Sequence, residues 1–339
     1  GPRQSVSYER VHRQVTRQIT EEDGGGRSGL ANLGNTCYMN SALQALANVV
    51  PVQDYILSFD WRRDVNGKNP LGSGGEIAAS FADLLAQMWL RTGSPGGAIV
   101  PRAFRTTVAR INVDFAGAQQ QDAQEFLAFL LDGIHEDLNR VVNKPYVEDV
   151  ESDGRPDEQV AMEAWGGYLR RNKSIIVDLF QGQLKSQLTC LACGRTATKF
   201  DPFMTLSVPI DAGEARMRGR STLARCLDLF CEEETLSGYD QVHCPRCKAH
   251  RDAHKRLSLY KTPPVLVVHL KRFGGAGGAL RKVDTHVDFP LEELDLEPFL
   301  SSRQRDAPTY DLTAVMYHSS YVRSFTSSGG VPSVGLRSQ

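Results

Sequence analysis

The stretch that decides the fold of this chain is Asn32-Leu33-Gly34-Asn35-Thr36-Cys37-Tyr38-Met39-Asn40-Ser41-Ala42, where a loop rich in Gly and Asn leads into a helix. The helix is predicted because apolar residues recur at steps of four, three and four. These residues are Met39, Leu43, Leu46 and Val50. Cys37 therefore lies in or next to the first helical turn, where unpaired backbone N–H groups and the helix dipole favour an anion. A cysteine in such a position is a candidate nucleophile.

Asn32 lies five residues before Cys37 and strengthens the catalytic interpretation. Its side-chain amide can donate a hydrogen bond to the oxyanion that forms when a thiolate attacks a carbonyl. The alternative interpretation is a buried, inert cysteine at a helix start. The flanking asparagine and the glycine loop favour the nucleophile.

The run Gly29–Ser41 resembles the Cys box of the ubiquitin-specific proteases, a family of papain-like cysteine deubiquitinases. The resemblance implies that Cys37 is the nucleophile and that Asn32 helps to hold the oxyanion. It extends from about residue 27 to about residue 318. It implies a papain-like fold with a helical thumb, zinc-bearing β fingers and a β palm.

The composition is ordinary and excludes several classes of function. Of the 339 residues, 41% are hydrophobic and 23% charged, with 39 Lys plus Arg against 40 Asp plus Glu. No basic run predicts a nucleic-acid partner, and no apolar stretch approaches the ~18–20 residues that span a membrane. The polar N-terminus lacks the apolar core of a secretory signal. Seven cysteines, four of them in two Cys-x-x-Cys pairs, predict metal binding and catalysis in an intracellular protein, cytoplasmic or nuclear.

The periodicity of apolar residues changes along the chain and indicates an α+β fold. Helical patterns dominate from residue 29 to about residue 143, and strand patterns follow after about Ser174. Helices are predicted at 77–88, at 126–138 and at 223–232, and strands at 175–177, 183–188 and 265–270. Asp122 and Glu125 are placed as a capping box before the second helix. Helices first and strands second are typical of α+β proteins.

We divide the chain into three segments on this basis. Residues 1–26 are predicted to be a polar linker from something upstream, because they lack apolar periodicity and the chain starts with Gly. Residues 27–174 are assigned to a thumb subdomain with the Cys box, and residues 175–339 to fingers and a partial palm with the metal site. The acidic residues 148–158 are predicted to form a solvated loop.

Two Cys-x-x-Cys pairs predict a metal site. Cys190 and Cys193 form one pair, and Cys244 and Cys247 form the other. Each pair has the spacing at which a tight turn presents two thiolates to one ion, and four thiolates suit tetrahedral zinc in a closed, structural site. The alternative is a set of reduced surface thiols. The long separation of the pairs resembles the zinc-bearing fingers of the family. Cys226 and Cys231 are assigned to packing.

A polar segment before the helix at 126–138 resembles the family's Gln-x-Asp-x-Gln-Glu element. The resemblance implies that Gln120, Asp122 and Gln124 line the channel for the extended C-terminal tail of ubiquitin. Arginines of that tail need a carboxylate, and its backbone needs amide partners. We predict that Asp122 both caps the helix and contacts the tail, and that Glu125 is a capping residue.

The palm is where the chain departs from the family pattern. Residues 310–315 resemble a strand that leads in the family to a Gly-His-Tyr with the general base, followed by Asn or Asp. His318 lies just past that strand, at a position that is not the base in the family, and residues 319–339 contain no histidine. The palm is therefore predicted to be incomplete and to lack the catalytic His and Asn or Asp. His269, within an apolar strand, is predicted to be packed and hydrogen-bonded.

The resemblance implies a deubiquitinating thiol hydrolase that cleaves the isopeptide or peptide bond after the C-terminal glycine of ubiquitin, with ubiquitin and ubiquitinated proteins as partners. Two explanations account for the missing base. In one, the chain has been cut or its end altered, which we favour because a palm without its last strands exposes an unpaired edge. In the other, the chain is a catalytically silent module that binds ubiquitin. A zinc-ribbon nucleic-acid binder ranks last, since no aromatics are interleaved with the arginines between the cysteine pairs.

Overall fold

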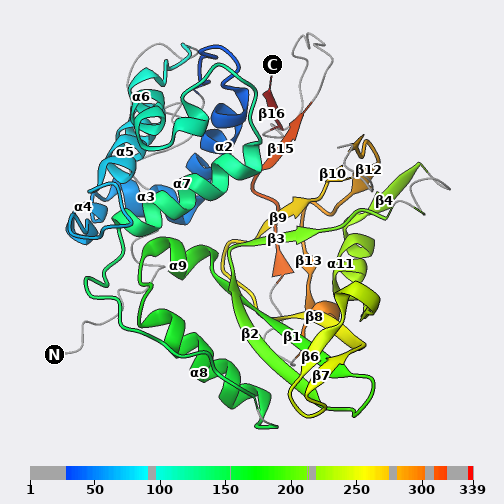
Figure 1. Ribbon diagram of the computed structural model, residues 1–339. Helices are drawn as coiled ribbons and strands as arrows, with labels where there is room; N and C mark the ends of the chain where they lie inside the picture. Colours follow the sequence, from blue (N-terminus) through cyan, green and yellow to red (C-terminus); the bar gives the residue numbers. More distant parts are fainter. Residues whose placement is uncertain are drawn as a thin grey trace. The chain divides into compact units, whose positions relative to one another are not determined.

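The computed structural model describes residues 28–90, 97–152, 154–211, 213, 219–274, 281–301, 309–318 and 335–338. The chain divides into two compact units, whose elements are labelled in Figure 1. Unit 1 comprises residues 1–142, 173–176 and 313–339, and unit 2 comprises residues 143–172 and 177–312. The predicted linker 1–26 lies outside the described residues. Because the two units interleave along the chain, the segment boundaries at 27–174 and 175–339 stay predictions.

Unit 1 is built mainly from helices. They are α2 (Cys37–Ala47), α3 (Val50–Leu57), α4 (Trp61–Asp64), α5 (Glu76–Trp89), α6 (Arg102–Ile111), the 3-10 helix η2 (Val113–Phe115) and α7 (Ala123–Asp137). A short parallel pair of strands, β15 (Val315–His318) and β16 (Gly335–Ser338), also belongs to this unit. The α5 and α7 helices confirm the predicted helices at 77–88 and 126–138.

The core of unit 1 is formed by the apolar stripes that the sequence predicted. Met39, Leu43 and Leu46 of α2 are buried, and so are Phe126 and Leu130 of α7. Burying a side chain of this size contributes about 1.5–3 kcal/mol relative to leaving it exposed. The two stripes therefore account for much of the stability of this helical unit.

The prediction that Val50 continues the apolar face of the first helix is wrong. Val50 is exposed and begins a second helix, because α2 ends at Ala47. The break occurs at Val49, whose backbone is extended, two residues before Pro51 near the start of α3. Proline lacks the N–H that a continuous helix would need at this point. The apolar period alone did not reveal this break.

Unit 2 is built around an antiparallel sheet in the order β2-β1-β8-β5. Its strands are β1 (Gly182–Cys190), β2 (Thr196–Phe203), β8 (Ala253–Lys261) and β5 (Glu234–Leu236). β1 confirms the strand predicted at 183–188. It lies between two neighbours, and at Gly182 an added methyl group would sit 2.7 Å from the carbonyl oxygen of Lys261. Only glycine therefore allows the strands to approach this closely.

Shorter strands and helices complete unit 2. Parallel pairs are β3 (Thr205–Val208) with β9 (Val267–Leu270) and β4 (Arg220–Thr222) with β12 (His286–Asp288). Antiparallel pairs are β6 (Val242–Cys244) with β7 (Ala249–Arg251), β10 (Phe273–Gly274) with β11 (Arg281–Lys282), and β13 (Leu294–Asp295) with β14 (Thr309–Tyr310). The helices are α8 (Asp157–Leu169), α9 (Ile175–Phe180, beginning in unit 1), α11 (Leu223–Cys231), η3 (Gly238–Asp240) and η4 (Glu297–Phe299).

The strand predicted at 175–177 is wrong, because these residues begin the helix α9. Ile176, Val177, Leu179 and Phe180 are buried and Asp178 is exposed, so most of the surface of this short helix faces protein. A short, continuous apolar run of this kind is compatible with either a strand or a buried helix, and β-branched residues favour the strand locally. Tertiary packing decided in favour of the helix.

The remaining predicted elements are confirmed. α11 agrees with the helix at 223–232, and Thr222 caps it by accepting a hydrogen bond from the N–H of Arg225. Cys226 is fully buried in the core of unit 2, and Cys231 packs against that core, as assigned. β9 covers most of the strand at 265–270, and the acidic loop ends where Asp157 opens α8. The mixture of helices and sheet confirms the α+β class.

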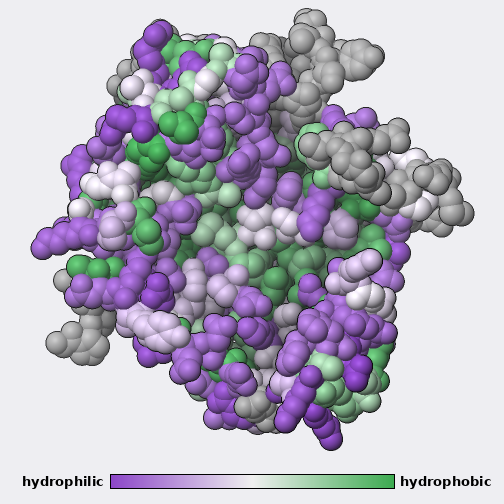
Figure 2. Space-filling model, in the orientation of Figure 1, coloured by the Kyte–Doolittle hydropathy of each residue, from purple (hydrophilic) through white to green (hydrophobic). Residues whose placement is uncertain are grey.

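The surface is mixed in character. Figure 2 shows hydrophilic and apolar side chains mixed on one face. Within the described part of the chain, no helix is both long and apolar enough to cross a membrane.

Candidate active site

Cys37 is the first residue of α2 and is half-buried. The preceding Thr36 occupies the N-cap position, but its hydroxyl does not cap the helix. That hydroxyl instead accepts from the N–H of Leu33 at 2.9 Å and donates to Asn32 Oδ1 at 3.1 Å. Because the usual capping group is engaged in the loop, Thr36 does not compete with an anion at the start of α2.

Asn32 is exposed and is oriented by its own loop. Its Oδ1 accepts hydrogen bonds from the backbone N–H of Gly34 at 3.0 Å and of Thr36 at 3.1 Å. Because these bonds hold the oxygen of the amide, the orientation of the Nδ2 group is fixed as well, and Nδ2 has no hydrogen-bond partner among the described residues. A fixed and unengaged amide donor is what stabilisation of an oxyanion requires.

The loop depends on two consecutive residues with left-handed backbone. Gly34 has a φ of 93° and Asn35 a φ of 52°. Glycine adopts such angles without a steric penalty, and asparagine tolerates them better than most residues. The Gly-Asn dipeptide before Thr36 therefore has a conformational reason, which the sequence showed only as a Gly/Asn-rich stretch.

Aromatic packing holds the first turn of α2 in place. The ring of Tyr38 lies 5.6 Å from that of Phe126 in an edge-on arrangement and 5.9 Å from that of Phe115 in a stacked one. Burial raises the pKa of Tyr38, and the positive charge of Arg105 partly opposes this effect. The sequence analysis assigned no role to Tyr38, which lies within the quoted stretch 32–42, or to Phe115, which lies shortly before Gln120.

The segment predicted to bind substrate lies beside the cysteine loop within unit 1. Asn35 Nδ2 donates to the carbonyl oxygen of Ala118 at 2.8 Å. Arg105 of α6 donates to the carbonyl oxygens of Leu33 at 3.1 Å and Gly117 at 3.3 Å. These bonds join the loop that carries Asn32 to the loop that precedes Gln120. Arg105 was missed by the sequence analysis, since nothing in its local pattern signals a tertiary contact.

Asp122 has the capping role that the sequence predicted. Its Oδ1 accepts from the N–H of Gln124 at 2.6 Å and of Glu125 at 3.3 Å, and α7 begins at the next residue. Asp122 and Gln120 are exposed, and Gln124 is half-buried. Their side chains therefore border solvent near the start of α7. A contact between these residues and a substrate stays a prediction.

The four cysteines of the Cys-x-x-Cys pairs come together in unit 2. Cys190 ends β1 and Cys244 ends β6, and the second cysteine of each pair lies in the turn that follows. All four Sγ atoms lie within 4.8 Å of one another. The sulfurs of Cys193 and Cys244 are 3.6 Å apart, and those of Cys190 and Cys247 are 4.0 Å apart. These four residues could hold a metal ion.

The two turns have matching geometry and no disulfide. A residue with left-handed backbone follows each pair, Gly194 with a φ of 68° and Lys248 with a φ of 52°. The seven cysteines are all free thiols. In a tetrahedral site with Zn–S bonds of about 2.3 Å the sulfurs are about 3.8 Å apart, which agrees with the distances here.

The pKa shifts of two cysteines in the cluster also favour the binding of a cation. A hydrogen bond from the N–H of Cys247 to the sulfur of Cys244 lowers the pKa of Cys244 to about 6. The hydrogen bond with Cys193 raises the pKa of Cys247 to about 12, and burial adds to the effect. The Cys244 thiolate therefore forms readily, while Cys247 resists ionisation unless a positive ion lies beside it.

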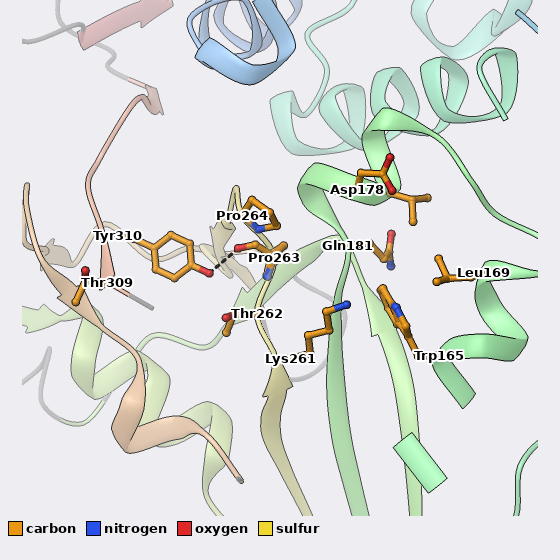
Figure 3. A pocket seen from close by; sticks show the side chains of 11 residues that line it. Trp165, Leu169, Asp178, Gln181, Lys261, Thr262, Pro263, Pro264, Thr309 and Tyr310 are labelled. Carbon is orange, nitrogen blue, oxygen red and sulfur yellow. Dashed lines mark hydrogen bonds between the residues drawn. The ribbon is translucent and has the colours of Figure 1, made fainter. Parts of the chain in front are cut away.

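Unit 2 also contains a cavity of about 590 Å³ bordered by α8, α9, the end of β8 and β14 (Figure 3). Lys261 places its Nζ 4.1 Å from the ring centroid of Trp165, and Tyr310 donates to the carbonyl oxygen of Pro263 at 2.5 Å. Burial lowers the pKa of Lys261, and Asp178 partly opposes this effect. None of the predicted catalytic, substrate-binding or metal residues lines this cavity.

The sequence analysis discussed two histidines, His269 and His318. His269 of β9 is half-buried and its Nδ1 lies 3.2 Å from the hydroxyl of Ser207, its partner in the β3–β9 register. This contact confirms the packed, hydrogen-bonded histidine. His318 is the last residue of β15, and residues 319–334, which follow it, lie outside the described residues.

A family model and individual relatives all match the chain to the same protein family. Residues 28–324 match the sequence model of the family described as ubiquitin carboxyl-terminal hydrolase. Ubiquitin carboxyl-terminal hydrolase 2 of Rattus norvegicus is 42% identical over 301 residues, which make up 89% of this chain and 47% of that protein. Ubiquitin carboxyl-terminal hydrolase 9 of Arabidopsis thaliana is 54% identical over 231 residues, 67% of this chain and 24% of that protein. The chain spans less than half the length of these relatives.

Solved structures with a similar fold also match the chain. One match is a chain of the structure described as the SAGA DUB module Ubp8/Sgf11/Sus1/Sgf73 bound to monoubiquitin. The TM-score is 0.61 at 25% sequence identity, covering 87% of this chain and 60% of that chain. The same module bound to ubiquitin aldehyde matches with a TM-score of 0.60 at 24% identity, covering 88% and 61%.

Proposed function

Because the chain belongs to the ubiquitin carboxyl-terminal hydrolase family, we propose that it hydrolyses the isopeptide or peptide bond after the C-terminal glycine of ubiquitin. The observation that carries this proposal is the geometry around Cys37. The cysteine stands at an uncapped helix start, five residues after an asparagine whose amide oxygen is fixed by the intervening loop. Ubiquitin and ubiquitinated proteins are the proposed partners, and the free cysteines support an intracellular location.

The reaction would proceed by nucleophilic attack in two stages. The Cys37 thiolate adds to the carbonyl carbon of the terminal glycine, and Nδ2 of Asn32 donates to the oxygen that becomes negative. Collapse of this adduct breaks the C–N bond, and the amine leaves with a proton. Water then attacks the thioester, releasing the ubiquitin carboxylate and the thiol. A general base must carry the proton in both stages.

The polar start of α7 would receive the ubiquitin tail. The exposed side chains of Gln120 and Asp122 and the half-buried Gln124 offer amide and carboxylate groups to an extended, basic peptide. The hydrogen bonds between the 33–35 loop and the 117–118 loop support this assignment, because they hold the proposed tail-binding segment beside the nucleophile loop.

The two roles of Asp122 can be separated by one substitution. We expect Asp122→Asn to keep the folding stability, because asparagine is as good a helix cap as aspartate. KM for ubiquitin substrates should rise at least about tenfold, because the carboxylate is lost. Asp122→Ala should raise KM to a similar extent and also lower the free energy of unfolding by about 1 kcal/mol. Thermal unfolding and steady-state kinetics measure both effects. An unchanged KM in Asp122→Asn would restrict Asp122 to capping.

A ubiquitin derivative with a C-terminal electrophile tests the proposed function. We expect the probe to form a covalent adduct with the chain, mapped by mass spectrometry to Cys37, and ubiquitin without an electrophile to compete with the labelling. A chain that binds ubiquitin but does not react would instead be a non-enzymatic ubiquitin-binding module. A chain that neither binds nor reacts would contradict both interpretations.

We further propose that the cluster of Cys190, Cys193, Cys244 and Cys247 holds a structural zinc ion. The sulfur distances fit a tetrahedral site of four thiolates, and such a site has no open coordination position for water or substrate. The four residues would therefore hold the β1–β2 and β6–β7 turns together and take no part in hydrolysis.

A further inference from the structure

Two loops of unit 1 that are distant in sequence are joined by one guanidinium group. Arg105 donates through Nη1 to the carbonyl oxygen of Leu33 and through Nη2 to that of Gly117, at 3.1 and 3.3 Å. Beside it, Asn35 Nδ2 donates to the carbonyl oxygen of Ala118 at 2.8 Å. We call these three hydrogen bonds the clasp.

The clasp connects two segments with different proposed roles. On one side, Leu33 and Asn35 belong to the loop between Asn32 and Cys37. On the other side, Gly117 and Ala118 lead directly into the segment that contains Gln120 and Asp122. A change in the distance between the two loops would therefore move the nucleophile relative to the residues that would hold the substrate.

The chemistry of Arg105 suits this task. A guanidinium is planar, and its two terminal nitrogens can bind two acceptors at a fixed separation, which a lysine ammonium cannot reproduce. Arg105 is half-buried, so its hydrogen bond to Leu33 is partly shielded from competing water. Its neighbour one turn earlier in α6, Arg102, is exposed, and no hydrogen bond or ion pair engages its side chain within the described part of the chain.

The other polar contacts of the two loops are local. Asn32 and Thr36 bond within their own loop. Gln121 Nε2 donates to the carbonyl oxygen of Asp114 at 2.7 Å, which closes the second loop on itself. The three bonds of the clasp, in contrast, run from one loop to the other.

We propose that Arg105, assisted by Asn35, is a positioning residue that sets the placement of Cys37 relative to the segment holding the substrate. The inference rests on the proposed hydrolase function. Misplacing reacting groups by about 1 Å can cost on the order of a hundredfold in rate. Loosening the clasp should therefore slow the chemical step more than it weakens substrate binding.

The central experiment compares Arg105→Ala with Arg102→Ala, which removes the same charge from the same helix. With a fluorogenic ubiquitin C-terminal amide as substrate, we expect kcat of Arg105→Ala to fall about tenfold while KM changes less than about threefold. Arg102→Ala should match the wild type. Arg105→Lys keeps the positive charge but not the fork, so its kcat should fall between those of the wild type and Arg105→Ala. Equal kcat values in the Arg105 and Arg102 variants would overturn the proposal.

A double-mutant cycle with Asn35→Gly tests whether the two residues act together. Glycine retains the left-handed backbone at this position but removes the donor to Ala118. If both substitutions open the same clasp, the double variant should lose little more kcat than the more impaired single variant. Losses that multiply would show that Arg105 and Asn35 act independently, which contradicts a shared clasp.

Amide hydrogen exchange measures the clasp without any ubiquitin reagent. In Arg105→Ala, the amides of residues 33–36 and 117–121 should exchange at least about tenfold faster, while the rest of unit 1 is unchanged. A uniform increase across unit 1 would indicate a general stabilising role instead. If the wild type failed to react with ubiquitin probes, the proposed function would fall, and exchange would still decide whether the clasp holds the two loops.

Discussion

Replacing Cys37 with alanine is expected to reduce cleavage of ubiquitin conjugates to background while leaving the affinity for ubiquitin within about twofold. The thiolate is the protein group that forms a covalent bond to the substrate in the proposed mechanism, so its loss removes the reaction path. Binding should persist because the proposed tail contacts lie on Gln120, Asp122 and Gln124. Cleavage is measured with a ubiquitin conjugate, and affinity by calorimetry with free ubiquitin.

Cys231→Ala is the matched control for this substitution. Cys231 is half-buried and packs against the core of unit 2, and burial raises its pKa to about 11. It therefore remains a protonated, unreactive thiol at neutral pH, and its removal should leave cleavage unchanged. Should Cys37→Ala lose ubiquitin affinity and thermal stability together with activity, Cys37 would be a structural residue and the assignment of the nucleophile would be wrong.

Replacing Cys190 or Cys244 with serine is expected to release the bound zinc ion and to destabilise unit 2. A structural zinc site contributes its binding free energy directly to folding. For a unit of this size, each kcal/mol of lost stability lowers the melting temperature by about 2–4 °C. Loss of several kcal/mol should therefore lower the melting temperature by about 10 °C. Elemental analysis should find one zinc ion per wild-type chain and close to none in either variant.

Metal removal provides an independent check of the same site. A chelator should lower the melting temperature of the wild type to that of Cys190→Ser and should have no further effect on the variant. Cys231→Ser, which changes a cysteine outside the cluster, should retain the metal. A metal content that is the same in wild type and Cys190→Ser would refute the site, whatever the change in stability.

Several features were predictable from the sequence because they depend on residues close together in the chain. Capping of α7 by Asp122 follows from side-chain bonds over two or three residues, and the start of α2 at Cys37 follows from its apolar period. The β1 strand was recognisable from its alternation. The errors occurred where the local signal was ambiguous. The apolar run at 175–177 suited a strand or a buried helix, and Pro51 interrupted a period that otherwise continued to Val50.

By itself, the sequence determined the class of fold, the candidate nucleophile and its asparagine, and the four candidate metal ligands. Each of these follows from a motif in which spacing along the backbone dictates what neighbouring side chains can do. Only the tertiary structure decided that two cysteine pairs fifty residues apart converge within 4.8 Å, and that Arg105 joins the carbonyls of Leu33 and Gly117. Such contacts depend on how distant elements pack, and no local pattern around either partner records them.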